Sequence, residues 1–113
     1  MKQLFPTKNI LMTRGVQTLL TDYLDRGDCI SPTILMTDIS KMLEKHFANM
    51  GEECYADKRL NKQAIKNMEG RVFSTFTLNN IKFFIITDGL HLHNSKEYGK
   101  DYPYTTIMLS EEY

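Results

Sequence analysis

The sequence predicts an α+β fold, in which helices pack against an antiparallel sheet. Its 113 residues, 42% of them hydrophobic, suit one domain with one core, and we expect that domain to span residues 1–113. Apolar residues recur at helical spacing over the first part of the chain, whereas β-branched and aromatic runs occupy the last third. Because helices and strands are segregated along the chain, we expect two layers, with about three helices on a sheet of three to four strands.

The N-terminal region predicts a short strand and then a helix. Residues 9–13 form an apolar run that fits an edge strand. Gly27 can adopt the left-handed conformation that ends a helix. The helix itself is predicted by apolar residues at positions i, i+3, i+4, i+7 and i+8, namely Val16, Leu19, Leu20, Tyr23 and Leu24.

A second helix is predicted from about Pro32 to Met50. Ser31 can cap its first amides, and proline is tolerated at the first helical position because its missing N–H has no partner there. Gly51 follows its end. His46 lies on the apolar side near the C-terminus, where we expect a half-buried histidine whose cation is favoured by the helix dipole.

A third helix is predicted from Asp57, as its N-cap, to a stop at Gly70. Its expected apolar face consists of Leu60, Ala64, Ile65 and Met68. Its opposite face carries the basic residues Lys58, Arg59, Lys62 and Lys66, and Arg71 follows shortly after.

The last third of the chain predicts strands. A β-hairpin is expected at residues 72–87, with its turn at Asn79-Asn80, because asparagine tolerates the positive φ of tight turns. The second strand of this hairpin should be central, covered on one side by helices. Residues 88–103 form a long polar loop, and residues 105–109 form a last strand.

The charge balance disfavours two classes of function. The 14 basic and 14 acidic side chains give a net charge of zero, which disfavours both a general nucleic-acid binder and a charge mimic of DNA. The charge is unevenly placed, because residues 58–71 hold five basic side chains and one acidic one. This segment could meet an acidic protein or nucleic acid, or it could be an ordinary solvated helix face.

Tyrosines supply a second candidate surface, since tyrosine combines a large contact area with a polar tip. The alternative is that some of these rings fold back over the sheet. The candidates for partner binding are Tyr98, Tyr102, Tyr104 and Tyr113.

Three weaker patterns bear on catalysis, metals and anions. His91 and His93 could share a metal, but a zinc site needs three or four ligands, and two solvated histidines are the simpler interpretation. Cys54 with His46 could suggest a thiol enzyme, but no orienting group or oxyanion hole is visible. The amides of residues 13–15, just before the first helix, could hold an anion. We therefore expect no cofactor and no metal.

The compartment is expected to be the cytoplasm. The first residues are too short and polar for a signal peptide, and no apolar run approaches the length of a membrane span. Cys29 and Cys54, without metal-type spacing, are expected to be reduced thiols.

Short segments distributed over most of the chain resemble the small bacterial "plasmid-related" proteins of mobile genetic elements. The chain departs from that family at Met50 and in the hairpin, where the family commonly has tryptophan, and in the longer loop at residues 88–104. The segments that carry the resemblance are Leu4-Phe5-Pro6, residues 12–16, Leu19-Leu20, Ser31-Pro32, His46 with Gly51, Glu52-Glu53, Asp57-Lys58 with Asn61, Ile86-Thr87, residues 105–109 and Glu111-Glu112-Tyr113.

The resemblance implies a binding role, and the family has no assigned enzymatic activity to carry over. Small proteins of plasmids, phages and other mobile elements often act as accessory or counter-defence factors, which inhibit restriction or CRISPR machinery by binding it. We therefore expect a non-enzymatic protein that binds a host defence protein, for example a CRISPR effector. The alternatives are a nucleic-acid-binding plasmid accessory protein that uses the basic helix at 58–71, and a small metal- or thiol-dependent enzyme.

Overall fold

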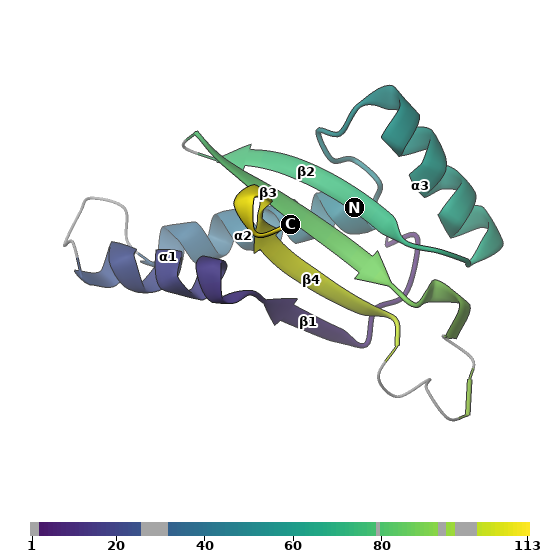
Figure 1. Cartoon of the computed structure of the whole chain (residues 1–113), viewed down its shortest axis with the longest axis horizontal. Helices are drawn as coiled ribbons and strands as arrows, with labels where there is room; N and C mark the ends of the chain where they lie inside the picture. The colour runs from purple at the N-terminus through teal and green to yellow at the C-terminus, as the bar shows by residue number, and fades with distance from the viewer. Residues whose placement is uncertain (1–2, 26–31, 79, 93–94, 97–101) are drawn as a thin grey trace.

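The computed structural model describes residues 3–25, 32–78, 80–92, 95–96 and 102–113 (Figure 1). Within them the α+β class is confirmed, with three α-helices and a four-stranded sheet. The elements are, in order, β1 (Asn9–Met12), α1 (Arg14–Asp25), α2 (Pro32–Phe47), α3 (Tyr55–Asn67), β2 (Val72–Leu78), β3 (Ile81–Asp88), the 3-10 turn η1 (Leu90–Leu92), β4 (Tyr104–Leu109) and the 3-10 turn η2 (Ser110–Glu112).

The sheet has the strand order β1-β4-β3-β2. Strands β2, β3 and β4 are antiparallel, as expected, but β1 pairs parallel to β4, so the sheet is mixed. The parallel pair is reached because the whole helical region and the hairpin lie between its two strands, which gives the chain room to return in the same direction. Strand β3 is internal, which confirms the predicted central strand.

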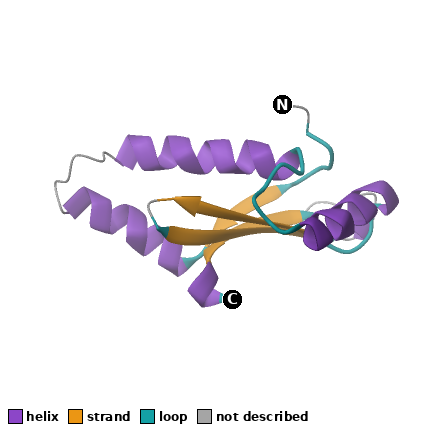
Figure 2. Ribbon diagram, turned by 90° about the horizontal axis from the view of Figure 1, so that it is seen from above, coloured by secondary structure: helices purple, strands orange, loops and turns teal. Residues whose placement is uncertain are grey.

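The main core lies between the sheet and the first two helices. Helix α2 crosses one face of the sheet, and α1 extends from the end of β1 (Figure 2). Over the opposite face, the described part of the chain places no α-helix, only η2 (Figures 1 and 2). The buried side chains of this core are Val16, Leu35, Ile39, Met42, Phe76, Phe83, Ile85 and Ile107.

A second cluster ties α3 and the loop after β3 to the sheet. Phe5, Val72 and Leu90 are its buried members, and Ala64 and Ile65 of α3 pack against it. Leu90 belongs to η1, so the segment expected to be a polar loop without structure contributes a fully buried side chain to the core.

Several helix ends differ from the predicted positions. Helix α2 ends at Phe47 rather than Met50, because Asn49 adopts a positive φ of 55°. The N–H of Met50 then donates to the carbonyl oxygen of Lys45 at 2.7 Å. Helix α3 begins at Tyr55, after Cys54, so Asp57 is in its first turn and is not its N-cap. The hairpin turn is confirmed at Asn80, whose φ is 66°. Gly27, Ser31 and Asn79 are outside the described residues.

The expected apolar face of α3 is wrong at one position. Leu60 is 62% exposed, whereas the polar Asn61 beside it is buried. The reason is that α3 packs at the edge of β2, whose outer backbone groups have no neighbouring strand. The Asn61 side chain can form hydrogen bonds to these groups, whereas an aliphatic side chain cannot. The helix is therefore rotated so that Asn61 faces the sheet and Leu60 faces solvent.

Candidate binding surfaces

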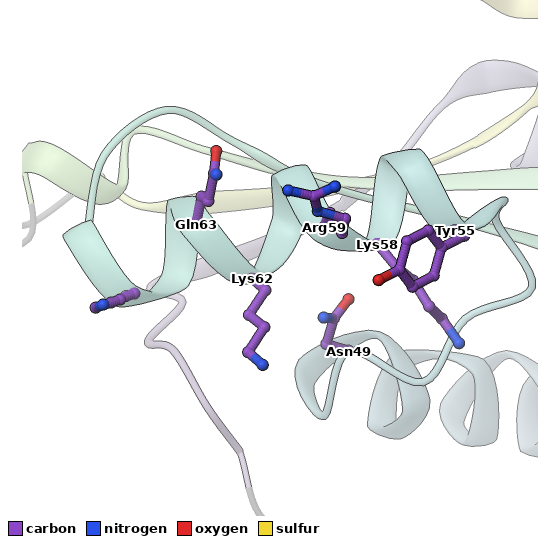
Figure 3. A pocket seen from close by; sticks show the side chains of 7 residues that line it. Asn49, Tyr55, Lys58, Arg59, Lys62 and Gln63 are labelled. Carbon is purple, nitrogen blue, oxygen red and sulfur yellow. The ribbon is translucent and has the colours of Figure 1, made fainter.

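Four of the five predicted basic residues meet along one groove of α3. The groove encloses about 500 Å³ and is lined by Asn49, Tyr55, Lys58, Arg59, Lys62, Gln63 and Lys66. Figure 3 shows the side chains of Lys58, Lys62, Tyr55 and Asn49 around this hollow, between α3 and the end of α2. Of the described residues, none that line the groove is acidic.

Asn61 fixes the orientation of the basic face. Its amide nitrogen donates to the carbonyl oxygen of Phe73 at 2.6 Å, and its amide oxygen accepts from the N–H of Phe73 at 2.9 Å. Through these two bonds, the Asn61 side chain pairs with the N–H and C=O of Phe73 as the backbone of a neighbouring strand would. The Asn61 amide also donates to Oδ1 of Asn49 at 3.2 Å. Asn49 lines the groove after the end of α2, so this bond connects that side of the groove to Asn61. The cations therefore project from a helix whose rotation is fixed.

Exposed apolar side chains lie next to the groove. Tyr55 lines it and is 77% exposed, and Met50, just before α3, is 53% exposed. Leu60, which is also exposed, lines a second hollow and not the groove. Aromatic, methionine and arginine side chains are enriched at protein interfaces.

Arg71, the fifth predicted basic residue, belongs to a different hollow. This second hollow, about 420 Å³, is lined by Asp57, Leu60, Asn61, Arg71, Phe73, Phe84 and Tyr113. The guanidinium of Arg71 donates to the hydroxyl of Tyr113 at 2.9 Å and lies 5.9 Å from the centre of its ring. We call this space the Arg71–Tyr113 hollow.

The structure divides the predicted tyrosine surface. Tyr102 and Tyr104 are in edge-to-face contact at 5.2 Å and line a small hollow with Asn9 and Leu11, near β1. Burial, the charge of Asp88 and the neighbouring Tyr102 raise the pKa of Tyr104. Tyr113 instead contacts Phe84 in the Arg71–Tyr113 hollow. Tyr98 is outside the described residues.

His46 is fully buried and neutral, so the expectation of a half-buried, cation-favouring histidine is wrong. Burial lowers its pKa to about 3. Its Nδ1 bonds to the hydroxyl of Ser74 at 2.7 Å and its Nε2 to that of Thr87 at 2.8 Å. Each of these hydroxyls is itself inaccessible. The Ser74–His46 pair has the spacing of a nucleophile and base, but both side chains are fully buried in this structure.

The other predicted catalytic and metal residues are not gathered into one site. Cys54 is exposed and donates to a carboxylate oxygen of Asp57 at 3.4 Å, while the ring nitrogens of His46 bond to hydroxyls. Among the described residues there is no group of three potential metal ligands. His91 is exposed, and His93 and Cys29 are outside the described residues.

The predicted anion site before α1 is occupied by the chain's own carboxylate. Glu112 accepts from the hydroxyl of Thr13 at 2.6 Å, from the N–H of Gly15 at 3.0 Å and from the N–H of Leu109 at 2.9 Å. These bonds lower the pKa of Glu112, with Thr13 contributing most. The Glu112 carboxylate of the same chain thus caps the start of α1.

The residues missed by sequence reasoning are the buried polar ones. Asn61 and Glu53 hold the edge of β2, and Thr105 extends the chain of hydroxyls that begins at His46. A signal existed, since Ser74, Thr87 and Thr105 each interrupt the apolar, core-facing side of a strand. Polar side chains at such positions require buried partners.

Comparison with known proteins found no match among protein-family models, curated proteins or solved structures. In the described part of the chain, no helix has both the length and the apolar character to cross a membrane.

Proposed function

We propose that this chain is a non-enzymatic binding protein that docks the basic groove of α3 on an acidic surface of a partner protein. The supporting observation is the groove itself, in which four cationic side chains border one hollow whose described lining includes no carboxylate. The resemblance to proteins of mobile elements supports a host defence protein as the proposed partner. Binding would then block that protein without chemistry at the interface.

The surroundings of the groove favour a protein over a nucleic acid. Tyr55 is exposed among the cations of the groove, and Met50 is exposed next to Asn49 of its lining, whereas nucleic-acid interfaces are more polar and more uniformly positive. Acidic side chains also outnumber basic ones in both flanking regions, residues 1–57 and 72–113. The chain as a whole therefore lacks the net positive charge that a general nucleic-acid binder uses.

Affinity capture with a charge-reversed groove tests the proposal. The test variant is Lys62→Glu/Lys66→Glu, and the matched control is Lys41→Glu/Lys45→Glu, which changes two exposed lysines of α2 at the same spacing. We expect a captured and identified partner to bind the control like the wild type and to bind the groove variant at least tenfold more weakly, about 1.4 kcal/mol. Equal binding to both variants, or no protein partner at several salt concentrations, would overturn the proposal.

A second candidate is binding of single-stranded nucleic acid. Lys58, Lys62 and Lys66 recur every fourth residue, which places them about 6 Å apart along the helix axis, and Tyr55 offers a ring for base stacking. Titration of an oligonucleotide at increasing salt separates the candidates. Nucleic-acid binding predicts an affinity that falls steeply and linearly in a log–log plot, and absence of binding at low salt removes this candidate.

A further inference from the structure

The Arg71–Tyr113 hollow is built from aromatic side chains on the sheet face that the described helices leave open. Phe73 and Phe84, on neighbouring strands β2 and β3, are in edge-to-face contact at 4.9 Å, and Tyr113 contacts Phe84 at 5.7 Å. Leu60 of α3 forms the opposite wall. With Leu60 62% and Tyr113 66% exposed, the two walls leave most of their apolar surface in water.

The polar groups of this hollow are already held in place. Asn61 is bonded to Phe73, and Arg71 is bonded to Tyr113 and positioned beside its ring. A side chain that enters would therefore order few groups, which keeps the entropic cost of binding small. Asp57 and Arg71 both line the hollow, so its formal charges cancel and it favours a charged side chain of neither sign.

The hollow and the basic groove are linked through lining residues that a third hollow shares with each of them. A third hollow, of about 370 Å³ at the C-terminal half of α3, shares Gln63 with the groove and shares Leu60 and Arg71 with the Arg71–Tyr113 hollow. One partner segment can therefore pass around α3 and touch both. Charge complementarity sets the chemistry of the part that lies on the groove, which four cations border, whereas each of the other two hollows holds one acidic residue, Asp57 or Glu69, besides Arg71.

We propose that the Arg71–Tyr113 hollow receives one apolar, uncharged side chain from an acidic segment of the partner protein, whose carboxylates lie along the α3 groove. This inference rests on the proposed function and adds the feature that the partner must carry. Large aromatic side chains buried in pockets supply much of the affinity of protein interfaces, with the surrounding charges providing selectivity. The segment is thus acidic with a single aromatic anchor.

Two synthetic glutamate-rich peptides test this, one with a central Trp and one with Ala at that position. The chain has no tryptophan, so the peptide's Trp emission reports only on the anchor. We expect the Trp peptide to bind about tenfold more tightly, a difference of about 1.4 kcal/mol, and its emission to shift to shorter wavelength on binding. The Leu60→Asp variant should lose this advantage and still bind the Ala peptide. The control, Leu11→Asp, introduces the same charge at a comparably exposed leucine of β1 and should keep the advantage.

The outcomes separate the two proposals. Equal affinity for the two peptides, with unshifted Trp emission, overturns the anchor site and leaves the groove intact. Failure of both peptides to bind the wild type overturns the proposed function and the anchor site together. An oligothymidine strand that binds more tightly than the Trp peptide, with an affinity that Leu60→Asp leaves unchanged, also overturns the anchor site and assigns the groove to nucleic acid.

Discussion

His46 is the centre of a buried series of hydrogen bonds whose direction can be deduced. The series passes through the side chains of Thr7, Thr105, Thr87, His46 and Ser74, with distances of 2.7–2.8 Å. Thr7 gives its single proton to the carbonyl oxygen of Asn9, at 3.2 Å, so Thr7 must accept from Thr105, and each hydroxyl further along donates toward Thr7. The proton of the neutral imidazole is therefore on Nε2, and Nδ1 accepts from Ser74.

This buried histidine predicts loss of stability in mild acid. Below about pH 6.5 the unfolded chain protonates His46, whereas the folded chain does not until about pH 3. The unfolded state then binds more protons, so the free energy of unfolding from this residue should fall by about 1.4 kcal/mol per pH unit, roughly 5 kcal/mol over the interval. Urea unfolding at pH 7, 6, 5 and 4 measures it.

Two variants make this prediction specific. The His46→Leu protein should be less stable at pH 7, because Ser74 and Thr87 lose a buried partner, but its stability should depend less on pH in this interval. The exposed His91→Gln serves as the histidine control and should keep the wild-type slope. A His46→Leu protein with that same slope would contradict the assignment.

Glu112 predicts a smaller and local effect. The Glu112→Gln variant should lose about 1 kcal/mol of stability at pH 7, because a neutral amide caps the start of α1 less well than a carboxylate. The exposure of this carboxylate limits the size of the effect. Its folded pKa is depressed, so the contribution is present above the unfolded pKa and is lost as the pH falls through the folded value. Thermal unfolding at pH 7 and pH 3 measures it, with Glu111→Gln as the neighbouring control.

At the scale of elements, the contact of α3 with β2 is made through the edge of a strand. Asn61 pairs with Phe73, the Glu53 carboxylate accepts from the N–H of Thr75 at 3.3 Å, and that of Glu52 accepts from Thr77 at 3.2 Å. The N–H of Glu52 completes the set by donating to the carbonyl oxygen of Thr75 at 2.9 Å. Side chains and one loop amide thus stand where a neighbouring strand would be, which protects an edge that could otherwise aggregate.

Removing the Asn61 amide should release this helix. The Asn61→Ala variant loses both bonds to Phe73 and leaves a part-buried backbone pair unsatisfied, so we expect a loss of about 2–4 kcal/mol. The amide proton of Phe73 should also exchange faster with solvent. Urea unfolding and hydrogen exchange measure the two effects, and Asn67→Ala, an exposed asparagine of the same helix, is the control. Unchanged exchange at Phe73 would contradict this account of the helix–sheet contact.

At the scale of the whole molecule, the neutral net charge conceals a basic face on an otherwise slightly acidic chain. The groove cations stabilise little, because they are largely exposed and the described structure assigns them no ion-pair partner. We therefore expect Lys62→Glu/Lys66→Glu to unfold within about 0.5 kcal/mol of the wild type. Thermal and urea unfolding check this, and a larger loss would mean that these lysines serve folding rather than binding.

The sequence was most informative where one periodicity dominates. The apolar spacing of α1 and α2 and the β-branched runs of β2 and β3 predicted their elements, because each buries a continuous apolar side. The rotation of α3 could not be predicted, since it depends on the bond between Asn61 and an edge that only the folded sheet creates. The basic stripe was recognised because its spacing of four residues is visible in the sequence. The separation of Arg71 from the stripe depends on the fold and was not predicted.

The sheet has two edge strands, β1 and β2, and side chains already bond to the backbone along the edge of β2. Strand β1 closes the other side of the strand order, is uncharged, and leaves Ile10 and Leu11 half exposed. Within the described residues, β1 is therefore the edge at which another chain could extend the sheet. If two copies joined there, each would present only its α3-covered edge to the outside, so growth would stop at a pair and could not propagate into a fibre.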